Sequence, residues 1–216
     1  MGGTDALPMG RVLAVCVATD DVDLGAVGVS AIDKRPQPDR VVVGELGPVT
    51  DHVCDTKHHG GADQAVYAYD DAEARRWAGE LGRELAYGWF GENLRIEGMP
   101  VTDAIVGERW AVGDDGLVLE TTIPRIPCRT FAAWAEEPQW VKRFMQRGDS
   151  GAYLRVLTPG TVGAGDEVRV VHRPDHGVRV RDLIFGTSAA DLRALLAGDD
   201  LPPKVRREAT KHLARA

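Results

Sequence analysis

Residues 121–131 are TTIPRIPCRTF, and this stretch carries the most informative local pattern in the chain. Pro124 and Pro127 fix their own φ angles and push the residue before each of them towards an extended conformation. Helical spacing of apolar residues begins just after Cys128, with Phe131 as its first member. The pattern predicts a stiff, extended approach to Cys128 and a helix that starts immediately after it.

Two arginines, Arg125 and Arg129, stand close to Cys128. Neighbouring cations and a helix N-terminus both favour a thiolate over a thiol. A stabilised thiolate is either a nucleophile or a ligand for a soft metal. The alternative is that Cys128 is a small buried side chain that serves only packing. The local sequence leaves both interpretations open.

Strand patterns lie on both sides of this stretch. Residues 107–112 and 117–122 predict a hairpin around an acidic, glycine-containing turn at 113–116. The second strand of the hairpin leads directly into the proline-rich approach to the cysteine. A further β pair is expected from residues 151–157 and 166–171.

The N-terminal half is also rich in strand patterns. Residues 11–19 predict a largely buried strand, in which Cys16 serves packing, and residues 64–69 predict another strand. Apolar residues at helical spacing predict a helix over 70–85, with an aspartate as its cap. Residues 88–94, GWFGENL, predict a structural turn that leads into the next strand.

Composition restricts the class of protein. The 216 residues carry 33 acidic and 26 basic side chains, a net charge of −7, which argues against binding to a nucleic acid polymer. Three cysteines form no disulfide framework, so we expect a reducing compartment and a cytoplasmic protein. No apolar run approaches the length needed to span a membrane, and no signal-peptide pattern stands at the N-terminus.

Residues 51–63, DHVCDTKHHGGAD, combine three histidines, a cysteine and two glycines. One interpretation is a metal site formed by His52, Cys54 and either His58 or His59, although the spacing fits no paired zinc motif. A second is a glycine turn that brings polar side chains and backbone N–H groups to a ligand. A solvated loop with no role is the third.

Five motifs in a fixed order resemble the MOSC family, named for the C-terminal domain of molybdenum cofactor sulfurases, and within it the stand-alone bacterial YiiM-like proteins. They span roughly residues 27–172 and are AIDKRP (31–36), HGGADQAVYAY (59–69), FGENL (90–94), PRIPC (124–128) and PG (159–160).

The resemblance implies a mainly β fold with flanking helices, in which a MOSC β-barrel-like domain is followed by a small three-helix domain. The expected divisions are 1–26 for a leader and the first strand, 27–173 for the MOSC core, and 178–216 for the helical domain. The helical tail is too short to hold a strong core alone, so we expect it to dock on the main domain or on a second subunit in a homodimer.

The resemblance also implies that Cys128 coordinates the molybdenum of a molybdopterin-type cofactor. The residues assigned to cofactor binding are Lys34, Arg35, Lys57, His58, His59, Gly60, Gly61, Glu92, Asn93 and Arg125. Arginine suits the phosphate of the pterin, and paired glycines let backbone N–H groups approach it. Asn93 can donate and accept towards a pterin edge, whereas Glu92 would orient a neighbour or a water. Exposed ion pairs are the alternative for the two lysines and for Arg35.

The reaction implied is the reduction of N-hydroxylated compounds, such as hydroxylaminopurines and amidoximes, at the cysteine-ligated molybdenum. The chain has no flavin or nicotinamide fingerprint, so a separate electron-transfer protein, a flavin or iron–sulfur reductase, is expected. The first alternative is a carrier that holds sulfur as a persulfide on Cys128 or passes on the cofactor. The second is a non-catalytic binder of a small oxidised purine.

Overall fold

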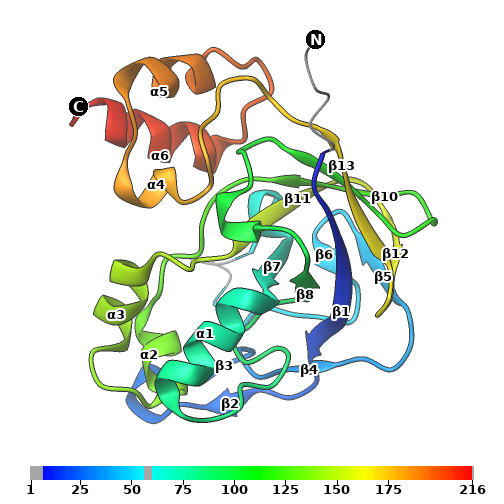
Figure 1. The fold of residues 1–216 in the computed structure, drawn as a ribbon. Coiled ribbons are helices and arrows are strands. Elements are labelled where there is room, and N and C mark those ends of the chain that lie inside the picture. Colours follow the sequence, from blue (N-terminus) through cyan, green and yellow to red (C-terminus); the bar gives the residue numbers. More distant parts are fainter. Residues whose placement is uncertain (1–6, 56–59, 216) are drawn as a thin grey trace.

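Seven strands close into a barrel in the computed structural model, which describes residues 7–55 and 60–215 (Figure 1). The order around the barrel is β13-β9-β10-β11-β7-β8-β1, and β1 pairs with β13 to close it. The strands are β1 (Met9–Ala18), β7 (Val66–Asp70), β8 (Leu94–Glu97), β9 (Arg109–Val112), β10 (Leu117–Thr121), β11 (Ala152–Thr158) and β13 (Glu167–His172). The prediction of a mainly β, barrel-like fold with flanking helices is confirmed.

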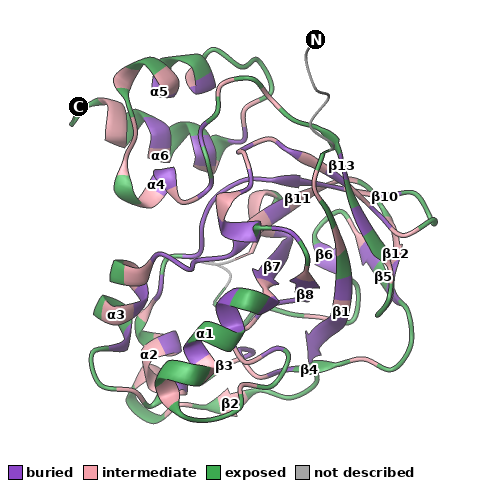
Figure 2. Cartoon of the chain, viewed as in Figure 1, coloured by how far each residue is buried: buried purple, intermediate pink, exposed green. Residues whose placement is uncertain are grey.

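Strand β1 holds the barrel together because it pairs with three neighbours along its length. Its first residues pair with β13, its middle with β8, and its last residues with β4 (Lys34–Pro36). The pairing with β4 places Ala18 opposite Lys34. Strand β4 thereby connects the barrel to the site described below. Figure 2 shows buried residues along β1, β7 and β8.

The barrel interior is filled by the inward-facing residues of alternating strands. Trp110 and Val112 of β9 face inward with Leu117 and Leu119 of β10, and all four are almost completely buried. This two-residue period is what a strand with one buried face requires. The expected hairpin over residues 107–122 is confirmed, with Leu119 opposite Trp110.

Strands β7 and β8 form the one parallel pair among the described strand pairings, and a parallel pair needs a crossover connection. Helix α1 (Asp71–Leu81) supplies it, and the side chain of Asp70 caps the helix by accepting from the N–H of Ala72. The helix is shorter than predicted because Gly82 adopts the left-handed conformation and ends it.

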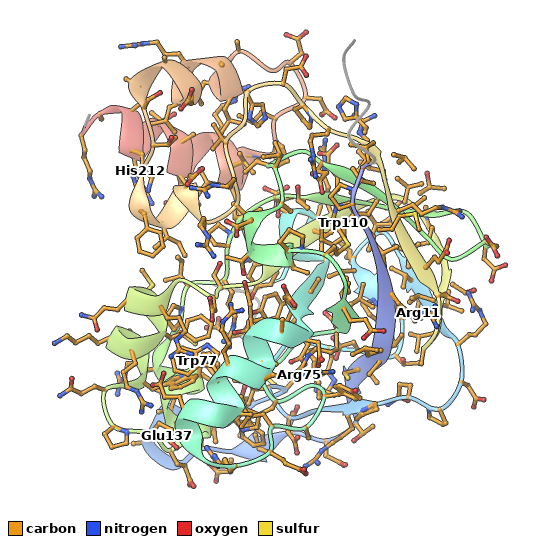
Figure 3. All side chains as sticks on the ribbon, viewed as in Figure 1. Arg11, Arg75, Trp77, Trp110, Glu137 and His212 are labelled. Carbon is orange, nitrogen blue, oxygen red and sulfur yellow. The ribbon has the colours of Figure 1, made fainter. Side chains whose placement is uncertain are left out.

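Helices α2 (Arg129–Ala135) and α3 (Trp140–Arg147) pack beside α1 and bury an aromatic cluster. Trp77 of α1 lies between the helices, with its ring centroid 4.6 Å from that of Trp140 (Figure 3). Phe131 contacts both Trp140 and Phe144 edge-on. This cluster anchors α2, and therefore the cysteine that precedes it.

Short elements complete the main body. A three-stranded sheet joins β12 (Gly160–Val162), β5 (Val41–Gly44) and β6 (Gly47–Pro48), and β2 (Val22–Asp23) pairs with β3 (Val29–Ser30). Three 3₁₀ turns are η1 (Gly25–Val27), η2 (Ala62–Gln64) and η3 (Val101–Asp103).

The predicted pairing of residues 151–157 with 166–171 is wrong. Strand β11 lies between β10 and β7, whereas β13 lies between β9 and β1. The intervening β12 leaves the barrel to pair with β5. Closure of the barrel requires the last strand, β13, to pair with the first strand, β1. β13 therefore does not pair with β11, although the two strands are close in the sequence.

Three helices follow the barrel at one end (Figure 1): α4 (Asp182–Phe185), α5 (Ala189–Leu196) and α6 (Pro203–Leu213). Leu192, Leu195 and Val205 are buried in the same apolar cluster as the barrel interior. Lys204 at the start of α6 donates its backbone N–H to Asp63 at 2.9 Å and its ammonium group to the carbonyl of Gly60 at 3.0 Å. The tail therefore docks on the barrel and contacts the glycine turn. None of the described helices is long and apolar enough to cross a membrane.

Candidate functional site

A cavity of about 480 Å³ opens beside β4, the glycine turn and the start of α2. Its volume lies within the usual range for sites that bind small molecules. Segments that are far apart in the sequence contribute to its wall. The predicted site residues that line it are Lys34, Gly60, Gly61, Asn93, Arg125 and Cys128.

Cys128 occupies the N-cap position of α2, with φ −115° and ψ 176°, as predicted from the prolines before it. The side chain is half-buried and lines the cavity. The backbone carbonyl of Cys128 accepts from Ala132 at 3.0 Å, which begins the helix. The thiol therefore lies at the positive end of a helix and faces a ligand-sized space.

The other two cysteines differ from Cys128 in position. Cys16 is fully buried in β1, and burial raises the pKa of its thiol well above the usual range, so it remains protonated. Cys54 is exposed and lies on the cavity wall. None of the three forms a disulfide. Only Cys128 among them combines access to the cavity with a helix N-terminus.

Arg125 projects into the cavity from the extended approach to Cys128. Only 7% of it is exposed, and its guanidinium lies 3.6 Å from the ring centroid of Phe131. Its Nη1 makes no hydrogen bond to any part of the described chain. Buried donors are almost always satisfied, and Arg125 lines the cavity, so its guanidinium is a candidate partner for an acceptor or anion of a ligand.

Tyr153, in β11, completes this side of the cavity. Burial raises the pKa of its hydroxyl, against the opposing effect of the Arg125 charge. Like an ordinary tyrosine, the phenol keeps its proton at neutral pH and can donate a hydrogen bond to a ligand. Tyr153 was not among the predicted site residues, because nothing local distinguishes it from the other aromatic residues of the strands.

Asp51 is a second site residue that the sequence analysis did not single out. Its carboxylate forms an ion pair with Lys34 and accepts from the side chain of Asn93 at 2.7 Å and from the N–H of Ala18 at 2.9 Å. Lys34 is only 8% exposed, so this pair is not an exposed one. It fixes the ammonium group in the cavity wall.

The side-chain amide of Asn93 is already committed within the protein. Its nitrogen donates to Asp51 and to the carbonyl of Cys16 at 3.1 Å, and its oxygen accepts from the N–H of Tyr67 at 3.1 Å. Asn93 therefore joins β1, β7 and the segment after β6. It can donate to a ligand only by giving up one of these hydrogen bonds.

Glu92 lies behind the cavity and is completely buried. Its two carboxylate oxygens accept from the backbone N–H groups of Gly88 at 2.8 Å and Phe90 at 2.9 Å, and it forms an ion pair with Arg95. These bonds fix the loop that connects α1 to β8. The structure therefore gives Glu92 a role in holding this loop, where the resemblance had assigned it to the cofactor.

The loop fixed by Glu92 presses against the backbone of β4. Gly88 has a φ of +89°, and a Cβ at this position would clash with the backbone carbonyl of Lys34. The close approach thus requires glycine, and it sets the position from which Lys34 reaches the cavity.

The remaining assigned residues differ in what the structure shows of them. Arg35 is exposed, pairs with Asp33 at 2.6 Å and does not line this cavity. Lys57, His58 and His59 fall outside the described residues. Gly60 and Gly61 adopt φ angles of +75° and +80°, so the predicted glycine turn is present and contributes to the cavity wall.

The chain is similar to several known proteins. The family model described as the MOSC domain matches residues 55–169. The uncharacterized protein YflK of Bacillus subtilis (strain 168) is 30% identical over 152 residues, which are 70% of this chain and 68% of YflK. A protein of Gibberella moniliformis named "Reductase" is 30% identical over 154 residues, 70% of this chain but only 27% of that protein. The crystal structure of YiiM from Geobacillus stearothermophilus matches with a TM-score of 0.75 and 25% identity, covering 95% of this chain and all of YiiM.

Proposed function

This chain belongs to the MOSC family, and we propose that it is a molybdenum-cofactor-dependent reductase of small N-hydroxylated compounds. The observation that carries the proposal is that Cys128 and Arg125, whose buried Nη1 has no hydrogen-bond partner in the described chain, line one cavity. A half-buried thiol suits a soft metal, and an unsatisfied buried guanidinium suits a phosphate. The reductase name of one relative supports a redox activity.

The cavity fits the chemistry of a molybdopterin-type cofactor. Cys128 would supply the thiolate ligand to molybdenum, and Arg125 and Lys34 would hold anionic or polar groups of the pterin part. The glycine turn at residues 60–61 lies in the same wall and exposes backbone to the ligand. When bound, the cofactor would supply two-electron redox chemistry that the protein side chains lack.

The protein's own residues would position the substrate and supply a proton. Loss of the N-hydroxyl oxygen as water requires proton delivery. The hydroxyl of Tyr153 carries a proton at neutral pH, as tyrosine ordinarily does, and the residue lines the cavity with Cys128. The ion pair with Lys34 commits the carboxylate of Asp51. We therefore assign proton donation to the Oη of Tyr153.

The electrons would come from a separate protein. The sequence has no dinucleotide-binding fingerprint, which supports a flavin or iron–sulfur reductase as the donor.

The test is turnover of benzamidoxime and of a hydroxylaminopurine with a chemically reduced viologen as the donor, on protein from a cofactor-competent host. We expect wild-type protein and Cys16→Ala to reduce these compounds, Cys128→Ala to be inactive, and Tyr153→Phe to lose at least about 100-fold in kcat. Stoichiometric molybdenum without turnover of any N-hydroxylated compound would contradict the proposal and favour a cofactor carrier. A persulfide on Cys128 without molybdenum would favour a sulfur carrier.

A further inference from the structure

Three metal-binding side chains of different kinds meet at the edge of the cavity. Asp21 comes from the loop after β1, and His52 and Cys54 come from the segment after β6. Their ligand atoms all lie within 4.8 Å of one another. The Nε2 of His52 lies 2.6 Å from Oδ1 of Asp21, and the thiol of Cys54 donates to the same oxygen at 3.3 Å.

We propose that Asp21, His52 and Cys54 bind a borderline-soft divalent cation, with zinc(II) as the best fit. Zinc is commonly bound by thiolate, imidazole and carboxylate ligands together. Calcium and magnesium prefer a shell of oxygen ligands, so the imidazole and the thiol argue against them. The carboxylate and the thiolate would together neutralise the two positive charges of the cation.

Two of the three ligand–ligand distances can be compared with those of a tetrahedral zinc site. Bonds of 2.0–2.3 Å to zinc place neighbouring nitrogen and oxygen ligands about 3.4 Å apart, and sulfur about 3.6 Å from either. The Cys54–Asp21 distance of 3.3 Å nearly meets this value. The His52–Asp21 pair must separate by roughly 0.8 Å, from its distance of 2.6 Å. Exposed side chains can make such a movement, because rotamer changes suffice.

One interpretation of the sequence took the third ligand from His58 or His59, which lie outside the described residues. Among the described residues the third ligand is Asp21, which lies 31 residues before His52. The three side chains leave a fourth coordination position for water, as in catalytic zinc sites. The proposal does not depend on the molybdenum cofactor, because none of the three ligands is Cys128 or Arg125.

The site would fix one wall of the cavity. His52 directly follows Asp51, whose carboxylate holds Lys34 and Asn93. His52 and Cys54 themselves line the cavity. A cation bound here would join this segment to the loop after β1 and so stabilise the position of the Lys34 ammonium group.

The experiment is a cobalt(II) titration of the full-length, chelator-treated protein, followed by displacement with zinc(II). Cobalt bound to a thiolate in a tetrahedral site gives a near-ultraviolet charge-transfer band and intense visible bands. We expect about one equivalent of cobalt with both features, and their loss on addition of one equivalent of zinc.

Matched variants locate the site. Cys54→Ser should abolish the charge-transfer band and weaken zinc binding at least tenfold, and Asp21→Asn should weaken binding at least tenfold. Asp20→Asn, which changes the neighbouring exposed carboxylate, should change affinity less than twofold, and Cys128→Ser should leave the band intact. Absence of the band in wild-type protein, its persistence in Cys54→Ser, or its loss in Cys128→Ser would each overturn the proposal.

Discussion

Replacing Glu92 with glutamine tests whether this residue holds the loop before β8. The carboxylate accepts from two backbone N–H groups and forms an ion pair with Arg95, which is only 1% exposed. In Glu92→Gln one acceptor oxygen is replaced by an NH₂ group. The guanidinium of Arg95 then has only the carboxylate of Asp71, at 3.4 Å, as an ion-pair partner. One buried N–H then faces another donor.

The expected loss of stability follows from the cost of leaving a buried charge without its partner. Breaking a buried ion pair from one side costs about 3–5 kcal/mol. Glutamine keeps one acceptor and nearly the same volume, so we expect a value near the lower limit, about 3 kcal/mol. The same reasoning predicts a coupling energy of about 1–3 kcal/mol between Glu92 and Arg95 in a double-mutant cycle with Arg95→Met.

The assay is urea-induced unfolding monitored by tryptophan fluorescence, with Glu84→Gln as the control. Glu84 is exposed, and its substitution should change the free energy of unfolding by less than about 0.5 kcal/mol. Folded Glu92→Gln protein should still retain cofactor, because Glu92 lies behind the cavity. A loss of stability below about 1 kcal/mol, or selective loss of cofactor from a fully stable variant, would refute this assignment.

Three further substitutions test separate parts of the structure. Gly88→Ala should lower the free energy of unfolding by about 1–3 kcal/mol more than Gly82→Ala does. Both glycines have positive φ, but only at Gly88 would a Cβ meet a backbone carbonyl. Equal urea midpoints for the two variants would contradict this. Arg125→Met should keep the contact with the ring of Phe131, so the free energy of unfolding should be unchanged or increased. The pterin content of the purified variant should fall at least tenfold. Full pterin content would contradict the role given to Arg125. Burial raises the pKa of Glu73 to about 8 from an ordinary value of 4.5, so the native state binds the extra proton and stability should fall as pH rises from about 4.5 to 8. Glu73→Gln should flatten this decline and exceed wild-type stability at pH 8 by up to a few kcal/mol, and parallel pH profiles would contradict it.

Local rules were sufficient where neighbouring residues determine the conformation. The two prolines and the helical spacing after them predicted Cys128 at the start of a helix, and the structure confirms this placement. The hairpin that leads into Cys128 was predictable because its turn and its alternation are both local. The barrel-like fold followed from the resemblance of ordered motifs.

Long-range contacts explain what local reasoning could not supply. Asp51 reaches Lys34 across 17 residues and Asn93 across 42, so no local pattern links them. Glu92 and Asn93 are adjacent in the sequence, but only Asn93 lines the cavity, because Glu92 turns back to Arg95 and the loop N–H groups. The pairing of β11 with β13 was predicted wrongly for the same reason, because barrel closure depends on the whole chain.

The central claim is that Cys128 binds molybdenum in this cavity. The most direct measurement is elemental analysis of molybdenum in wild-type protein and in Cys128→Ser, both expressed in a molybdate-supplied host that makes the cofactor. The account predicts close to one molybdenum per wild-type chain and almost none in a folded Cys128→Ser variant. Equal molybdenum in the two proteins, or none in the wild type, would contradict it.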